Sequence, residues 1–184
     1  MYWCKLKLLT VTALAGCLLT GSLACKPDVA ETGSALKYFD IKDYFTADTA
    51  RLKKLNPYIL KTVKHNGVTE TQKVKIENWG QELDSFVGAD INRPAWKNSY
   101  SIATGDSLLL YKAKTPELKV REIIIKKENG KVKWLVIYIK TENMLYKDVE
   151  KLSYYPDSLY LIEKDQHVKL MGNNHYKIQG VIQK

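Results

Sequence analysis

A series of turn sequences divides the second half of this chain into short β-rich runs. From Tyr100 onward, runs rich in β-branched and aromatic residues alternate with clusters of glycine, asparagine, aspartate and proline. The turn clusters begin at Thr104, Glu128, Thr141, Pro156 and Gly172. Connections this short join consecutive strands in opposite directions, so they predict a meander in an antiparallel sheet. Asn66-Gly67 predicts one more hairpin upstream, because both residues tolerate the positive φ of a type I′ turn.

Two helices are predicted before the meander. Apolar residues between Ile41 and about Leu55 follow one face of a 3.6-residue period, with Asp40 as the N-cap. A second helix is predicted from Asn78 to about Ile91, with Gln81 in capping-box spacing. The expected fold class is therefore α+β, with two helices packed on a curved antiparallel β-sheet of about seven to nine strands.

The hairpin around Asn129-Gly130 is apolar on both faces. Its second strand carries Val132, Trp134, Val136 and Tyr138 on one face and Leu135, Ile137 and Ile139 on the other, and its first strand contains Ile123, Ile124 and Ile125 in succession. A sheet with one solvated face alternates apolar and polar residues, so this pattern predicts cover on both sides. The helices account for one side. The sheet curled back on itself, a partner or an apolar ligand would cover the other, which makes Trp134 and Tyr138 the candidate ligand contacts.

Residues 1–24 have the pattern of a secretory leader. Lys5 and Lys7 precede an apolar run from Leu8 that ends in small residues, and polar residues and glycines interrupt the run. It is too short and too polar for a permanent membrane span. The predicted organisation is a lipoprotein signal peptide over 1–24, a lipidated cysteine with a flexible tether over 25–35, and a single α+β domain over 36–184.

Two cysteines compete for lipidation, because the end of the leader resembles the lipobox of bacterial lipoproteins. The residues before Cys17 match that motif better, whereas Cys25 stands where the apolar run ends and a polar segment begins. Cleavage before Cys25 would also remove Cys4 and Cys17, leaving no pair for a disulfide. We therefore favour Cys25, with Cys17 as the alternative and a plain cleaved signal left open. Two or three acyl chains on one cysteine would hold the chain stably on a membrane.

Charge and motifs exclude several classes of function. The net charge is +9, and its lysines are spread along the chain, which is typical of a basic soluble surface. The envelope location makes nucleic acid an unexpected partner. His65, His167 and His175 lie in no metal-binding spacing, and glycine loops and nucleophile elbows are missing from the sequence. Glu82 and Asp84 are expected on a solvated helix face. The sequence thus predicts no enzyme, no metal and no cofactor.

The leader with Cys25-Lys26-Pro27-Asp28, the segment from Tyr154 to Tyr160 and the ending from Tyr176 to Gly180 resemble uncharacterised envelope lipoproteins of the Bacteroidota. This resemblance implies a lipid-anchored protein of the cell envelope, on the outer membrane, and leaves both its periplasmic and external faces open. The leading hypothesis is a non-enzymatic binding or structural module whose partner is an envelope protein or glycan. The alternative is a carrier or receptor for a lipid or other apolar ligand in a curled-sheet cavity. A hydrolase of envelope polymers is a third hypothesis.

Overall fold

The computed structural model describes residues 36–183, and the first long element in this part is helix α2 (Ile41–Leu55). Asp40 caps it by accepting a hydrogen bond from the Asp43 backbone N–H at 2.8 Å. Asn56 ends it in the left-handed region, with a φ of 45°. The predicted bounds of this helix are confirmed.

The prediction of one helix from Asn78 to Ile91 is wrong. The chain forms two short helices instead, α3 (Trp79–Glu82) and α4 (Asp84–Val87), followed by the 3₁₀ turn η1 (Pro94–Trp96). Asn78 does cap α3, but Leu83 leaves helical geometry at a φ of −104°. Trp79, Leu83, Phe86 and Ile91 are nevertheless buried, so the apolar stripe reaches the core along a bent path. Gly80 and Gly88 are weak helix formers, so one straight helix is not strongly favoured here. The segment bends instead, which buries its apolar side chains.

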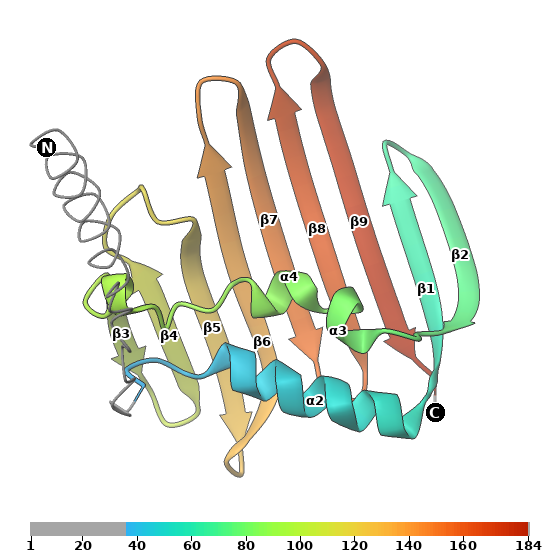
Figure 1. Ribbon diagram of the computed structural model, residues 1–184, viewed down its shortest axis with the longest axis horizontal. Coiled ribbons are helices and arrows are strands. Elements are labelled where there is room, and N and C mark those ends of the chain that lie inside the picture. The colour runs from blue at the N-terminus through green and yellow to red at the C-terminus, as the bar shows by residue number, and fades with distance from the viewer. Residues whose placement is uncertain (1–35, 184) are drawn as a thin grey trace, which may run out of the picture. The chain divides into compact units, whose positions relative to one another are not determined.

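The nine strands of residues 36–183 belong to one sheet (Figure 1). They are β1 (Tyr58–His65), β2 (Val68–Lys75), β3 (Tyr100–Thr104), β4 (Leu108–Ala113), β5 (Val120–Glu128), β6 (Lys131–Glu142), β7 (Tyr146–Tyr155), β8 (Leu159–Val168) and β9 (Gly172–Ile182). Every pairing is antiparallel, and the order is β2-β1-β9-β8-β7-β6-β5-β4-β3. The meander from Tyr100 onward and the Asn66-Gly67 hairpin are both confirmed. The hairpin β1–β2 joins the far end of the meander by pairing with β9.

The core forms where α2, α3 and α4 meet the sheet. Figure 1 shows these helices in front of one sheet face. Phe45 of α2 contacts Phe86 of α4 and Tyr154 of β7, each at a ring separation of 5.0 Å. Ile123, Ile125, Leu135 and Ile137 from β5 and β6 are completely buried on this side. Tyr100, Tyr111, Tyr154 and Tyr160 are also buried, so their rings pack on this side of the sheet.

Candidate functional site

The sheet face opposite the helices carries a largely apolar row that one serine interrupts. Leu110, Ile124, Val136, Ser153 and Leu161 lie side by side on neighbouring strands from β4 to β8. Residues paired across an antiparallel sheet share a face, and each of the four apolar residues here neighbours a core residue in sequence. The side chains of this row therefore point away from the helices. We call this side of the sheet the open face.

A second apolar row lies beside the first on the open face. Tyr155, Leu159, Val181 and Leu60 are consecutive partners across β7, β8, β9 and β1. Trp134 of β6 follows the same alternation. In the part of the chain that the structure describes, the three α-helices lie on the other side and none crosses this face (Figure 1). No described helix covers the two apolar rows, and most of their side chains are half-buried among their neighbours.

A charged row borders the apolar rows. Glu122, Tyr138, Lys151 and Glu163 are partners across β5 to β8, and Lys177 of β9 continues the row. Lysines outnumber carboxylates on the open face, which carries Lys64, Lys73, Lys75, Lys112, Lys126, Lys140, Lys147, Lys151 and Lys177 against Glu122, Glu142, Glu163 and Asp165. The open face therefore has an apolar centre with a basic border.

The two predicted contact residues lie on this open face. Trp134 is partly buried among its neighbours, and Tyr138 is 36% exposed. Tyr138 stands in the charged row, with the Lys151 Nζ 6.0 Å from its ring centroid. Trp134 and Tyr138 are separated by Val136 and share one side of β6. The structure therefore brings the predicted pair onto one surface, although the two side chains lie in different rows. The lipidation candidates Cys25 and Cys17 lie outside the described residues.

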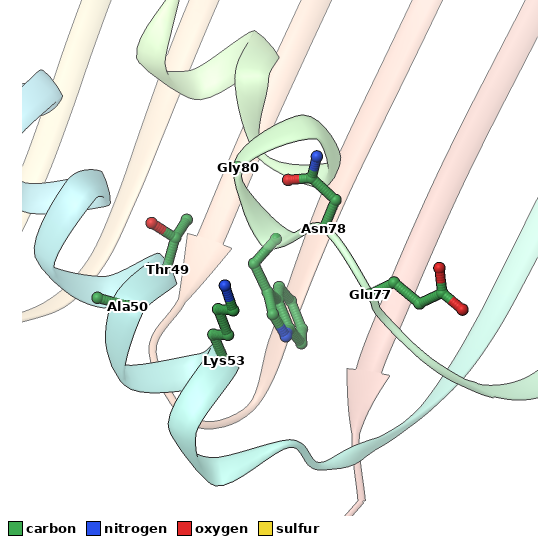
Figure 2. A pocket seen from close by; sticks show the side chains of 7 residues that line it. Thr49, Ala50, Lys53, Glu77, Asn78 and Gly80 are labelled. Atoms are coloured by element: carbon green, nitrogen blue, oxygen red, sulfur yellow. The ribbon is translucent and has the colours of Figure 1, made fainter.

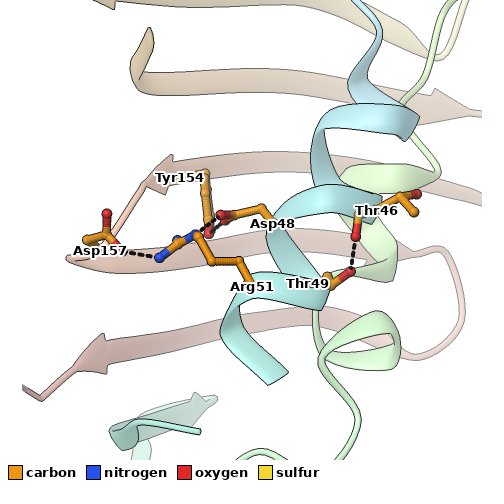
Figure 3. Close-up of polar contacts among 6 residues, drawn as sticks. All are labelled: Thr46, Asp48, Thr49, Arg51, Tyr154 and Asp157. Carbon is orange, nitrogen blue, oxygen red and sulfur yellow. Dashed lines mark hydrogen bonds and ion pairs between the residues drawn. The ribbon is translucent and has the colours of Figure 1, made fainter. Parts of the chain in front are cut away.

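The other side of the sheet has a polar cluster that ties α2 to β7 (Figure 3). The Tyr154 hydroxyl donates to Asp48 Oδ2. Arg51 Nε donates to Asp48 Oδ1 at 2.6 Å, and Arg51 Nη1 reaches Asp157 Oδ1 at 2.5 Å. Burial, followed by the nearby Asp48 carboxylate, raises the pKa of Tyr154 far above its ordinary value. Tyr154 therefore stays a protonated donor, and the cluster serves to hold the helix.

A second polar cluster ties α3 to the sheet. Glu82 accepts from the Tyr160 hydroxyl at 2.5 Å and pairs with Lys61 Nζ at 2.7 Å. Its side chain is largely buried, so the expectation of a solvated face is wrong for Glu82 and right for the exposed Asp84. Glu82 was expected on the surface because spacing within one segment does not reveal cross-sheet partners such as Tyr160.

Two shallow pockets lie beside α3. One of about 390 Å³ is lined by Thr49 and Lys53 of α2 and by the segment from Glu77 to Gly80 (Figure 2). The other, of about 530 Å³, lies over Ile162 and Ile178 and is bordered by Lys61 and Glu82. In both pockets the charged side chains belong to separate elements, and neither lining pairs a nucleophile with a base.

The three histidines have different contact partners, although His167 and His175 line one pocket together with Asp165. His65 stacks on Tyr176 at a ring separation of 4.3 Å, His167 contacts Asn173 and His175 contacts Asp165. Within residues 36–183, no group of three histidine, cysteine or acidic side chains is placed to hold a metal ion. No helix in that same range has the length and apolar character needed to span a bilayer.

Sequence reasoning missed the apolar residues in two hairpin turns. Met144 and Leu145 connect β6 to β7, and Leu170 and Met171 connect β8 to β9. All four are strongly exposed. The available signal was the presence of Met-Leu and Leu-Met pairs directly beside the predicted turn sequences, which end at Asn143 and begin at Gly172.

Comparisons of this chain with protein-family models, curated proteins and solved structures gave no match. The resemblance to Bacteroidota envelope lipoproteins therefore stays a prediction.

Proposed function

We propose that this chain is a membrane-anchored, non-enzymatic binding module whose open face binds another component of the cell envelope, a protein or a glycan. The observation that carries the proposal is the pair of apolar rows across β4 to β9 and β1, with no described helix over them. Monomeric proteins rarely leave a large contiguous apolar surface in water without a use for it.

The composition of the open face supports docking. Its centre contains Trp134, Tyr155 and aliphatic side chains, and its border contains lysines and carboxylates. Protein interfaces have this anatomy, with aromatic residues concentrated at the centre and charges at the rim. Aromatic rings also stack on sugar rings, so the same centre suits a glycan.

Anchoring comes from the leader and Cys25, with Cys17 as the alternative acceptor of the lipid. A chain held on the outer membrane by two or three acyl groups would present the open face to partners in the same compartment. The carrier alternative requires the sheet to curl around an apolar ligand. Within residues 36–183 the sheet ends at β2 and β3, which do not pair with each other, and this open arrangement favours docking on a surface over enclosure.

Site-specific photocrosslinking in the producing cells tests this function. A photoreactive phenylalanine replaces Tyr138 on the open face or, as the matched control, the exposed Asp84 on the helix side. Position 138 is expected to yield one discrete adduct, whereas position 84 yields none. Membrane fractionation of the same cells should show the chain in the membrane, with Cys25→Ser releasing it and Cys17→Ser leaving it in place.

The two parts of the proposal fail separately. Equal adducts at positions 138 and 84, or none at either, would reject the open face as the binding surface. A Cys25→Ser chain that stays in the membrane would reject Cys25 as the anchor.

A further inference from the structure

Three hairpin turns lie at the same end of the sheet, opposite α2. The turns β1–β2, β6–β7 and β8–β9 are all at the upper end in Figure 1. The registers agree, because His65 at the end of β1 pairs with Tyr176 near the start of β9, and Tyr146 at the start of β7 pairs with Val168 at the end of β8. We call the residues Val68, Met144, Leu145, Leu170 and Met171 in and beside these turns the hairpin tips.

The hairpin tips are the most exposed large apolar side chains in the described part of the chain. Leu170 is 95% exposed, Met144 82%, Met171 80%, and Leu145 and Val68 68% each. The next is Leu55 at 61%, at the opposite end of the molecule. An isolated exposed leucine is ordinary, but five such residues on three adjacent turns form a shared apolar end.

Hydrogen bonds between the turns hold this end together. The Lys169 backbone N–H donates to the Leu145 carbonyl at 3.1 Å, which joins the β8–β9 turn to the β6–β7 turn. Asn66 donates from its side chain to Asn174 Oδ1 at 3.0 Å and accepts from the His175 backbone N–H at 2.8 Å, which joins the β1–β2 turn to β9. The tips therefore form a fixed set, which would meet a partner together.

Basic side chains stand directly behind the tips. Lys64, Lys147 and Lys169 are exposed, and within residues 36–183 none of them has an ion-pair partner. Of the carboxylates nearby, Glu142 pairs with Lys140 at 2.6 Å and Asp165 contacts His175 at 2.5 Å, whereas Glu70 of β2 is exposed and has no ion-pair partner within residues 36–183. Three unpaired lysines thus stand against one unpaired carboxylate. The charge available for a partner at this end is therefore positive.

We propose that the hairpin tips dock on an anionic lipid surface, with the leucine and methionine side chains inserted at the boundary of headgroups and acyl chains and the lysines against lipid phosphates. Apolar side chains that project beyond a set of basic residues fit the chemistry of that interface. A lipid surface accepts apolar side chains without a matching shape, whereas a protein groove would have to be complementary to all three turns. The inference is independent of the lipid anchor, because it concerns residues of the domain alone.

The anchor and the tips are compatible with one membrane. The eleven residues from 25 to 35 would span up to about 36–40 Å if extended. A ten-residue strand rises about 33 Å. A chain anchored at Cys25 would thus be long enough for the far end of the sheet to reach the same bilayer.

Vesicle flotation of a chain beginning at Leu36 tests the proposal. Residues 36–184 form one compact unit that contains the core cluster described above, so this chain keeps that cluster. It is mixed with vesicles of phosphatidylcholine alone, or of phosphatidylcholine and phosphatidylglycerol in equal amounts. We expect binding to the anionic vesicles only, weakened at high salt, and at least tenfold weaker binding for the combined variant Met144→Ser, Leu145→Ser, Leu170→Ser and Met171→Ser.

Two matched variants control for loss of surface apolarity in general. Leu55→Ser removes an exposed leucine at the opposite end, and Tyr138→Ser changes the open face. Both are expected to bind vesicles as the unchanged chain does, and circular dichroism verifies that every variant is folded. The proposal is overturned if the unchanged chain does not bind anionic vesicles, which would direct the tips to a protein partner, or if Leu55→Ser weakens binding as much as the tip variant.

Discussion

Three buried tyrosine hydroxyls in this core differ in their hydrogen bonding. Tyr154 donates to Asp48 and Tyr160 donates to Glu82, whereas the Tyr100 hydroxyl has no hydrogen-bond partner within residues 36–183. Removing a donor from a buried carboxylate costs about 1–3 kcal/mol, whereas removing an unpaired hydroxyl relieves a desolvation penalty. We therefore expect Tyr154→Phe to lower the free energy of unfolding by that amount and Tyr100→Phe to leave it unchanged or raise it. Urea denaturation followed by circular dichroism measures both.

The pair Tyr100→Phe and Tyr154→Phe is matched, because each deletes one oxygen atom from a tyrosine that is at least 98% buried. Equal losses of stability in the two variants would show that the hydroxyls contribute through packing and not through hydrogen bonding. Such a result would also show that the hydrogen bond from Tyr154 to Asp48 does not stabilise the contact between α2 and β7.

At the scale of elements, the crossing of α3 over β8 and β9 depends on one glycine. The Tyr160 ring lies over Gly180 of β9 on its way to Glu82, so a Cβ at position 180 would overlap the ring atoms. We expect Gly180→Ala to displace Tyr160 and lower the free energy of unfolding by about 1–3 kcal/mol. Gly105→Ala is the control, because a Cβ there meets nothing within 4 Å. Chemical denaturation of both variants provides the measurement, and a Gly180→Ala chain as stable as Gly105→Ala would contradict the close approach.

Local sequence determined most individual elements but few of their contacts. Asn66, Asn129 and Asp157 adopt positive φ in the turns where the sequence predicted hairpins, because turn chemistry acts over four residues. The helix from Ile41 was also predicted from local sequence, because its N-cap and its apolar period lie within the segment itself. The bend at Leu83 and the Glu82–Tyr160 bond depend on residues far apart in the chain, which periodicity does not encode. For the same reason, Trp134 and Tyr138 were predicted on one face of their strand, whereas the pairing of β1 with β9, which extends that face, was not.

At the scale of the whole molecule, one sheet separates a helix side from an open face. The helix side buries its polar groups in the Asp48 and Glu82 clusters, which fix the helices. Within residues 36–183 no helix covers the apolar rows of the open face, and the hairpin tips add an apolar end. The residues that stabilise the domain and those proposed to bind partners therefore lie on different surfaces, so variants of the open face and the tips can change binding without unfolding the protein.

Burial of tyrosines on the helix side makes the free energy of unfolding sensitive to alkaline pH. Burial raises the pKa of Tyr100 to about 12, and burial also raises the pKa values of Tyr111, Tyr154 and Tyr160 above the ordinary value of 10. A tyrosine that ionises only in the unfolded chain stabilises the fold fully below pH 10, and this stability is lost as the pH rises from 10 toward the folded-state pKa. Each such group contributes a slope of about 1.4 kcal/mol per pH unit, so we expect cooperative unfolding between about pH 10 and 12.

The measurement is the free energy of unfolding as a function of pH, with tyrosinate absorbance recorded in parallel. Unfolding and ionisation of the buried tyrosines should occur together. Tyr100→Phe and Tyr154→Phe should each flatten the slope by one group's share, although only Tyr154→Phe lowers stability at neutral pH. If the four tyrosines ionise while circular dichroism still shows the folded sheet, their hydroxyls are accessible to solvent and the packing described for the helix side is incorrect.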